Sequence, residues 1–233
     1  MKPIGVVGGI GPESTIDYYR AMIAAYREAR PDGSYPPIVV NSIDASVMLG
    51  ALMRGELAQV ADLMVIELER LARAGAGVAL IAANSPHVVF GDVQRRSPLP
   101  LVSIVTATAF EAMRLGKKTL GLFGTRYTMQ GRFYHEVFAL SGMTIAVPDE
   151  AQQAYIHDKY MNELVKGILV PETRERLLAI VAEMKARDGI DAVILGGTEL
   201  PLLLRTPTVA GLPVLDTTEL HVNAIVERLR RPS

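Results

Sequence analysis

The sequence predicts an α/β protein that is built on parallel sheets and organised as two similar halves. Short apolar runs alternate with longer amphipathic stretches along the whole chain, as expected for strands that each lead into a helix. A weak internal repeat points to the two halves. GVVGG at 5–9 is matched by GLFGT at 121–125, and GVALIAANSPH at 77–87 by DAVILGGTELP at 191–201. Each pair reads as a strand, a turn and then a helix.

The apolar runs and the amphipathic stretches locate the individual elements. The stretch 56–75 shows how a helix is assigned, because its apolar residues recur at helical spacing and it ends at Gly75, a residue type that commonly terminates helices. Strands are expected at 4–8, 37–42, 78–82, 101–105, 119–123, 144–147, 192–195 and 213–215. Helices are expected at about 13–29, 56–74, 105–115, 128–141, 152–166, 171–187 and 217–230.

The repeat also predicts how the chain divides. We expect a first lobe from residues 1–100 plus 210–233, with the last strand and helix returning to it, and a second lobe from residues 101–209. Ligands of open α/β sheets bind outside the carboxyl ends of the strands. Two such lobes packed face to face would place their strand-end loops around one cleft, and we expect the active site there.

Composition excludes several classes of protein. The 233 residues include 24 basic and 25 acidic side chains, which gives no electrostatic footprint for a nucleic acid. No apolar run approaches the roughly 18–20 residues that a membrane span needs. The chain has no cysteine, which excludes disulfides, thiolate catalysis and thiolate metal sites. We therefore expect a cytoplasmic protein without nucleic-acid or membrane partners.

The first strand leads into a glycine-rich turn, Gly8–Thr15. A dinucleotide-binding fingerprint needs a third glycine where this turn has Ser14, and Glu13 brings negative charge to the place of a pyrophosphate. We instead expect Gly9, Gly11 and Ser14 to present backbone N–H groups to a small carboxylate at the start of a helix. A tight turn without any ligand is the alternative.

Polar residues also follow two strands that occupy equivalent places in the repeat. Asn84, Ser85 and His87 follow one, and Thr198 and Glu199 follow the other. Loops at strand ends often carry function, so these residues are candidates for binding and catalysis. The alternatives are helix capping by the amide, hydroxyl and carboxylate groups, and a buried, hydrogen-bonded imidazole at His87.

The motifs GGIGPEST (8–15), ANSPH (83–87), GTRYTM (124–129), GGTELP (196–201) and LPVLDTTELH (212–221) together resemble the aspartate/glutamate racemase family, in the correct order along essentially the whole chain. The resemblance implies two Rossmann-like lobes, a site between them, no cofactor, and often a homodimer. It also implies a small carboxylate or amino-acid ligand. Substrate-binding positions suggested by it, besides those above, are Thr125, Thr128 and a basic residue, Arg54 or Lys159.

The chain departs from the family at its two catalytic positions. In the resemblance, two cysteines on opposite faces of the substrate remove and return the α-proton. Here Ala83 and Gly197 stand at those positions. Neither residue can act as an acid or a base, and the smaller side chains would leave room for water or a larger substrate.

Other groups must therefore supply any proton transfer. Ser85 and Thr198 have hydroxyls, His87 titrates near neutral pH, and Glu199 or Asp44 would serve as a base if burial raised its pKa. No spacing of His, Asp and Glu predicts a metal site. We expect a cofactor-independent racemase or isomerase acting on aspartate, glutamate or a similar small carboxylate. One-sided lyase or decarboxylase chemistry and an inactive carboxylate-binding homologue are the alternatives.

Overall fold

A computed structural model describes residues 2–30 and 32–230 of the chain. It divides into two compact units, each with its own sheet. The first unit runs to Ile104 and includes the C-terminal segment from His221, and the second unit is Val105–Leu220. The predicted α/β class with two lobes is confirmed.

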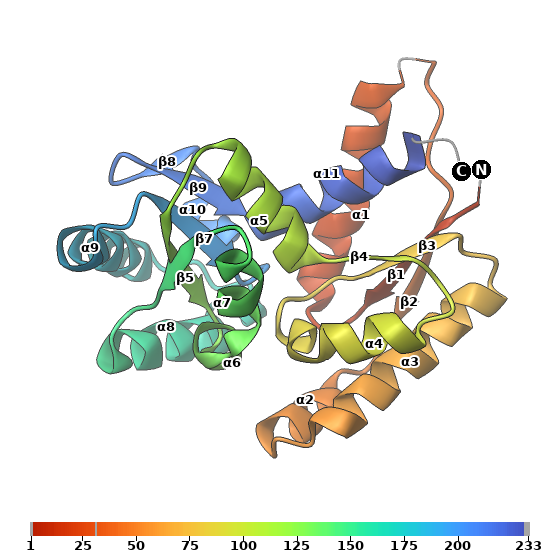
Figure 1. Ribbon diagram of the computed structural model, residues 1–233, viewed down its shortest axis with the longest axis horizontal. Coiled ribbons are helices and arrows are strands. Elements are labelled where there is room, and N and C mark those ends of the chain that lie inside the picture. Colours follow the sequence, from red (N-terminus) through yellow and green to blue (C-terminus); the bar gives the residue numbers. More distant parts are fainter. Residues whose placement is uncertain (1, 31, 231–233) are drawn as a thin grey trace. The chain divides into compact units, whose positions relative to one another are not determined.

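The first unit contains a parallel four-stranded sheet in the order β2-β1-β3-β4 (Figure 1). Its strands are β1 (Ile4–Gly8), β2 (Ile38–Ser42), β3 (Val78–Ile81) and β4 (Leu101–Val102). Its helices are α1 (Pro12–Ala29), α2 (Ser46–Met53), α3 (Leu57–Arg73), the 3-10 helix η1 (Ser85–Val89) and α4 (Phe90–Arg96). Tyr18 and Met22 of α1 pack with Val222 and Ile225 of α11 (Thr217–Arg230) in a core that also includes Ile4 of β1.

The second unit contains a five-stranded sheet in the order β6-β5-β7-β9-β8. The strands are β5 (Thr119–Gly124), β6 (Thr144–Ala146), β7 (Ala192–Gly196), β8 (Thr208–Val209) and β9 (Leu212–Asp216). Neighbouring strands of this sheet are parallel, except that β8 is antiparallel to β9. The helices are α5 (Ile104–Arg114), α6 (Arg126–Gln130), α7 (Arg132–Ala139), α8 (Glu150–Asn162), η2 (Leu164–Lys166), α9 (Pro171–Asp188), α10 (Pro201–Leu204) and the beginning of α11.

The sheet orders explain the internal repeat. In the first sheet β1 lies between β2 and β3, and in the second β5 lies between β6 and β7. The repeated segments 5–9 and 121–125 thus belong to strands in equivalent places, as do the segments 77–87 and 191–201. The register continues to the strand ends, where Val7 pairs with Ile81 and Gly124 with Gly196.

The last strand does not return to the first lobe, contrary to the expectation that residues 210–233 belong there. Leu215 of β9 pairs with Ile194 of β7, so this strand is the fourth member of the second sheet. Only the chain from His221 onward belongs to the first unit. The apolar character of β9 predicted a strand correctly but could not say which sheet it joins, because both sheets have an edge for a parallel neighbour.

Several helix boundaries also differ from the expectation. The helix expected at 128–141 is two helices, α6 and α7, which meet at Gly131. Gly131 has the extended angles φ −70° and ψ 145°, which end the first helix and cap the next. The helix α2 and the short strand β8 were not predicted, because each is short.

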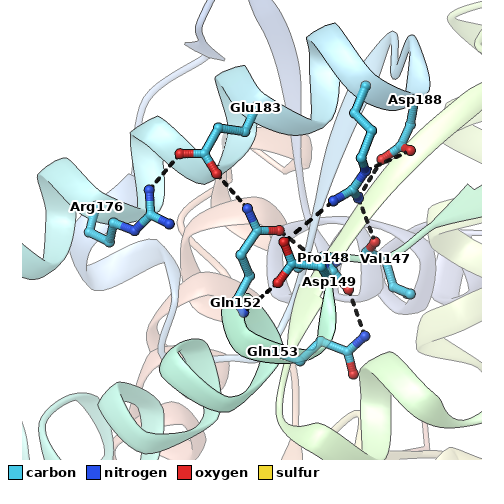
Figure 2. A network of polar contacts seen from close by, with 9 residues as sticks. Val147, Pro148, Asp149, Gln152, Gln153, Arg176, Glu183 and Asp188 are labelled. Atoms are coloured by element: carbon cyan, nitrogen blue, oxygen red, sulfur yellow. Dashed lines mark hydrogen bonds and ion pairs between the residues drawn. The ribbon is translucent and has the colours of Figure 1, made fainter.

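Helix α8 is fixed by a polar network at its N-terminus (Figure 2). Asp149 and Gln152 form a capping box, in which each side chain accepts a hydrogen bond from the other residue's backbone N–H. The Gln152 amide also donates to Glu183 of α9, and Arg176 donates to the same carboxylate at 2.6 Å. These contacts hold α8 against α9 and so set the position of the residues further along α8.

Candidate functional site

The turn after β1 is fastened by its own side chains. The Gly9 N–H donates to Thr15 Oγ1 at 2.9 Å, and the Ser14 hydroxyl donates to the Gly11 carbonyl at 2.8 Å. Gly9 has a φ of +81°, and a Cβ built there would lie 2.3 Å from the Ile43 carbonyl oxygen. Only glycine fits this position. Pro12 is the first residue of α1, as expected for this turn.

These contacts reduce the number of hydrogen-bond donors that the turn can offer to a ligand. The N–H of Gly9 and the hydroxyl of Ser14 are already bonded within the turn. The first N–H groups of an α-helix have no hydrogen-bond partner within the helix. Glu13 and Ser14 lie in the first turn of α1, so their backbone N–H groups are the donors that the turn can offer to an anion. An anion at this turn would therefore be held by the backbone at the start of α1.

The end of β3 is adjacent to this turn, because β1 and β3 are neighbours and the Ala82 N–H donates to the Val7 carbonyl at 2.9 Å. Ala83 and Asn84 are buried there. Asn84 precedes η1, yet its side chain makes no capping hydrogen bond. Capping therefore does not account for an amide side chain at this position.

His87 is buried, and both of its ring nitrogens bond to the backbone. Its Nδ1–H donates to the Ala83 carbonyl at 2.9 Å, and its Nε2 accepts from the Ile104 N–H at 3.2 Å. The ring also stacks on Phe90 at a centroid distance of 4.8 Å. Burial, followed by the nearby His221, lowers the pKa of His87 to about 3. The imidazole is neutral at physiological pH, and these contacts favour the structural alternative for His87.

His221 is held in the same way and lies edge-to-face with His87, at a centroid distance of 6.1 Å. Its Nε2–H donates to the Val102 carbonyl at 2.8 Å, and its Nδ1 accepts from the Tyr18 hydroxyl at 2.9 Å. Burial lowers its pKa to about 4. The two histidines therefore hold the segment 102–104 and the start of the C-terminal segment in place within the first unit.

In the second unit, Thr125 and Thr128 lie at the end of β5. Thr125 caps α6, because its hydroxyl oxygen accepts from the Thr128 N–H at 3.4 Å. The two hydroxyl oxygens are 3.3 Å apart, and Thr128 is fully buried. These residues line the turn next to β7, since β5 and β7 are paired to their ends at Gly124 and Gly196.

The end of β7 contains a buried cluster of hydroxyl and carboxylate groups. Tyr160 of α8 donates its hydroxyl hydrogen to Glu199 Oε2, and Thr198 Oγ1 donates to the same oxygen at 2.9 Å. Tyr160, Thr198 and Glu199 are all buried. Burial, followed by the negative charge of Glu199, raises the pKa of Tyr160 well above its usual value. The phenol is therefore protonated at any physiological pH.

The ring of Tyr160 also fills the space beside Gly197. A Cβ built on Gly197 would lie 2.4 Å from Tyr160 Cε2, far closer than any real contact. The expectation that glycine at this position leaves room for water or a larger substrate is therefore wrong. Sequence reasoning missed Tyr160, because nothing local marks it and its partner lies 39 residues further along the chain.

The basic candidates are engaged in ion pairs within their own units. Arg54, in the turn between α2 and α3, makes two hydrogen bonds to Glu56, at 2.9 and 2.8 Å. Lys159 pairs with Glu163 at 2.6 Å. The Arg54 side chain is exposed and that of Lys159 is partly exposed. Ion pairs in contact with solvent are weak, so either side chain can exchange its carboxylate partner for another anion.

Asp44 does not become a base through burial. It is exposed, and hydrogen bonds from Ser46 lower its pKa. Over residues 2–30 and 32–230, no three His, Asp or Glu side chains gather in a way that would hold a metal ion. Within the same residues, no helix has the length and apolar character of a membrane span.

The sequence and the structure of this chain are both similar to those of known proteins. Residues 7–225 match the family model described as Asp/Glu/Hydantoin racemase. The broad specificity amino-acid racemase RacX of Bacillus subtilis is 26% identical over 194 residues, which cover 76% of this chain and 75% of that protein.

Two crystal structures are similar over nearly the whole chain. One, of a Yersinia pestis protein, has a TM-score of 0.90 at 30% identity and covers 99% of this chain and 100% of the other. The second, an aspartate racemase homologue from Pyrococcus horikoshii, has a TM-score of 0.85 at 32% identity, with the same coverage of 99% and 100%.

Proposed function

The chain belongs to the Asp/Glu/hydantoin racemase family and is an enzyme of the racemase type, and we propose that it transfers the α-proton of aspartate, glutamate or a similar small amino-acid carboxylate. We propose that it needs no cofactor. The groups that move the proton must differ from the family's thiols, since the chain has no cysteine.

The observation that carries this proposal is the extent of the family match. It runs from residue 7 to residue 225 and so includes the ends of β1, β3, β5 and β7. Those ends hold the small, hydroxyl and amide residues that suit a carboxylate: Gly9, Gly11, Ser14, Asn84, Ser85, Thr125, Thr128 and Thr198. Ligands of open α/β sheets bind at such ends.

The substrate carboxylate is best held without a dedicated arginine. The N-terminus of α1 carries partial positive charge and backbone donors, which favour an anion. Arg54 and Lys159 are the candidates for a second carboxylate of the substrate, by exchange of their ion pairs with Glu56 and Glu163.

One-sided chemistry, such as proton exchange without inversion or decarboxylation, is the second candidate. Racemisation needs an acid or base on each of two faces. Ala83 offers neither, and His87 near it has both ring nitrogens bonded to the backbone. A single proton-transfer group suffices for one-sided chemistry.

The test is a proton-exchange scan. The protein is incubated in D₂O with both enantiomers of a panel of amino acids, and loss of the α-proton signal is followed by NMR, with chiral chromatography of the same samples. We expect exchange with aspartate, glutamate or another carboxylate of the panel. Exchange with inversion supports the racemase, and exchange with retention supports one-sided chemistry. No exchange with any member would overturn the enzymatic proposal and leave a binding homologue.

Ligand binding is measured separately. A ligand that binds only the folded chain raises its melting temperature by mass action. We expect millimolar aspartate or glutamate to raise the melting temperature more than an equal concentration of chloride. An equal shift with chloride would show an ionic-strength effect and count against a carboxylate site.

We also propose that the chain works in the cytoplasm as a homodimer. The absence of cysteine suits a reducing compartment, and the resemblance to the family supports the dimer. Sedimentation velocity at micromolar concentration tests the oligomeric state, and a single monomeric species would contradict it.

A further inference from the structure

Tyr160 reaches a strand end of the second unit, the kind of place where α/β sheets bind ligands. It comes from α8 and reaches the end of β7, next to Gly197. The ring fills the space beside this glycine. The phenol oxygen of Tyr160 would lie 3.1 Å from a Cβ built on Gly197, so it brings a polar atom to this strand end. The position lies at the carboxyl ends of β5 and β7, where α/β sheets bind ligands.

The phenol is connected to a proton acceptor. Its hydroxyl hydrogen points to Glu199 Oε2, which also accepts from Thr198 Oγ1 at 2.9 Å. Glu199 is only 3% exposed, so these two hydroxyls replace water around its carboxylate. A buried carboxylate that is joined to a phenol can take the phenol's proton at the moment when the phenol oxygen receives another.

We propose that Tyr160 and Glu199 form a proton-transfer pair, with Tyr160 as the group that exchanges the proton with the substrate and Thr198 positioning the carboxylate. The proposal rests on the proposed function. In the forward step the Cα–H bond breaks and its electron pair passes into the adjacent carboxyl group. The α-proton goes to the Tyr160 oxygen, and the original phenolic proton goes to Glu199 Oε2.

This relay explains why a tyrosine with an elevated pKa can serve. Burial and the neighbouring carboxylate raise the pKa of Tyr160, so a phenolate is not available as a base. In the relay the phenol gains one proton as it loses another and never becomes charged. The return step reverses both transfers, and solvent deuterium reaches Cα when the hydrogen on the Tyr160 oxygen has exchanged with D₂O before the return.

The buried histidines of the first unit are bonded at both ring nitrogens. His87 and His221 each bond a backbone carbonyl with one nitrogen. The other nitrogen accepts a hydrogen bond, from the Ile104 N–H in His87 and from the Tyr18 hydroxyl in His221. Both rings would have to break these contacts before they could reach a substrate. Tyr160 and Glu199 need only shift hydrogens along a hydrogen bond that already exists.

The test compares α-proton exchange in D₂O for the intact chain and three variants, with the most reactive amino acid of the panel at saturating concentration. Tyr160→Phe keeps the ring and removes the oxygen. Glu199→Gln keeps the shape and removes the proton acceptor. Tyr134→Phe is the matched control, because Tyr134 is a buried tyrosine of the same unit whose hydroxyl bonds to Thr108 and not to Glu199.

General acid–base groups contribute about 10²–10⁴-fold, so we expect Tyr160→Phe and Glu199→Gln each to lower the exchange rate by at least about 100-fold. Tyr134→Phe should retain the parent's rate. Circular dichroism and melting temperature confirm that each variant is folded. Should Glu199→Gln fail to fold, Tyr160→Phe decides the proposal alone, because it leaves the packing against Gly197 unchanged.

The outcomes separate the two proposals. Exchange by the parent that persists in a folded Tyr160→Phe variant would overturn the pair and leave the proposed function intact. Equal losses in Tyr160→Phe and Tyr134→Phe would also overturn it, since removal of any buried hydroxyl would then suffice. Absence of exchange in the parent would overturn the proposed function, and the pair with it.

Discussion

The ring of Tyr160 occupies the space that a side chain at residue 197 would need, since a Cβ on Gly197 would lie 2.4 Å from Tyr160 Cε2. Gly197 is not one of the glycines with a positive φ, so the neighbouring ring and not the backbone is what requires glycine here. A larger residue at position 197 therefore requires a smaller one at position 160. This relationship also determines how a thiol can be introduced at residue 197, the position at which the resemblance to the family implies a cysteine.

We expect Gly197→Ala to destabilise the protein, because overpacking in a well-filled interior typically costs about 1–3 kcal/mol. In a Tyr160→Leu background the same change should cost much less, since the ring is gone. Urea unfolding of the parent, both single variants and the double variant measures the coupling. Additive costs would mean that the ring moves aside easily.

Restoring the thiols is expected to need three substitutions. Ala83→Cys with Gly197→Cys should leave racemisation of aspartate and glutamate weak, because the new side chain at 197 meets Tyr160. Adding Tyr160→Leu should raise the rate above that of the double variant. Chiral chromatography of the products measures it. A double variant that is already as fast as the triple one would contradict the role of the ring.

Acid should destabilise the protein because it protonates His87 and His221 in the unfolded chain. Their pKa values are lowered to about 3 and about 4 in the folded state, while the unfolded chain has values near 6.5. The folded state therefore binds fewer protons, and stability that is complete above pH 6.5 is lost as the pH falls toward 4. Each histidine contributes a slope of up to roughly 1.4 kcal/mol per pH unit.

Urea unfolding between pH 7.5 and pH 5 measures this slope. His221→Gln removes one of the two titrations while keeping a donor and an acceptor, so it should lower the stability at pH 7.5 and flatten the pH dependence. The same slope in the variant and the parent would show that other groups cause the loss.

Two adjacent threonines at the start of α11 should respond in opposite ways. The Thr217 hydroxyl donates to the Leu195 carbonyl at 2.7 Å in a buried setting. Across the part of the chain that the structure describes, the Thr218 hydroxyl is the buried side-chain oxygen without a hydrogen-bond partner. An unsatisfied buried polar group costs free energy, whereas a satisfied one is costly to remove.

We therefore expect Thr217→Val to destabilise the protein by about 1–3 kcal/mol and Thr218→Val to be neutral or stabilising. Both substitutions replace a hydroxyl by a methyl of similar size, so each is the control for the other in urea unfolding. A loss at Thr218→Val as large as that at Thr217→Val would show that the Thr218 hydroxyl has a partner in solution, such as water.

Gly9→Ala should be far more costly than Gly33→Ala. Both glycines have a positive φ, +81° and +78°, so both variants carry the conformational penalty of about 1–2 kcal/mol. Only Gly9 also has atoms in the way, the nearest being the Ile43 carbonyl oxygen, whereas nothing lies within 4 Å of a Cβ at Gly33. Thermal melts of the two variants measure the difference, and equal melting temperatures would contradict the close packing at Gly9.

The sequence by itself determined the fold class, the strands and the strand ends. Strand periodicity and the repeated segments are local properties, and they predicted β1, β3, β5 and β7 to within a residue or two. The glycine-rich turn with Pro12 at the helix start was likewise readable, because turn chemistry depends on adjacent residues. The candidate site residues at strand ends followed from these elements.

Only the tertiary structure decided what those residues touch. Periodicity reports that a side chain is buried but not what it is buried against. Tyr18 bonds to His221 across 203 residues and Tyr160 to Glu199 across 39, and no local pattern records either pairing. The sheet joined by β9 depended in the same way on a partner strand elsewhere in the chain. The identity of such partners is set by packing of the whole unit, because each contact gains its free energy only when distant segments are already in place.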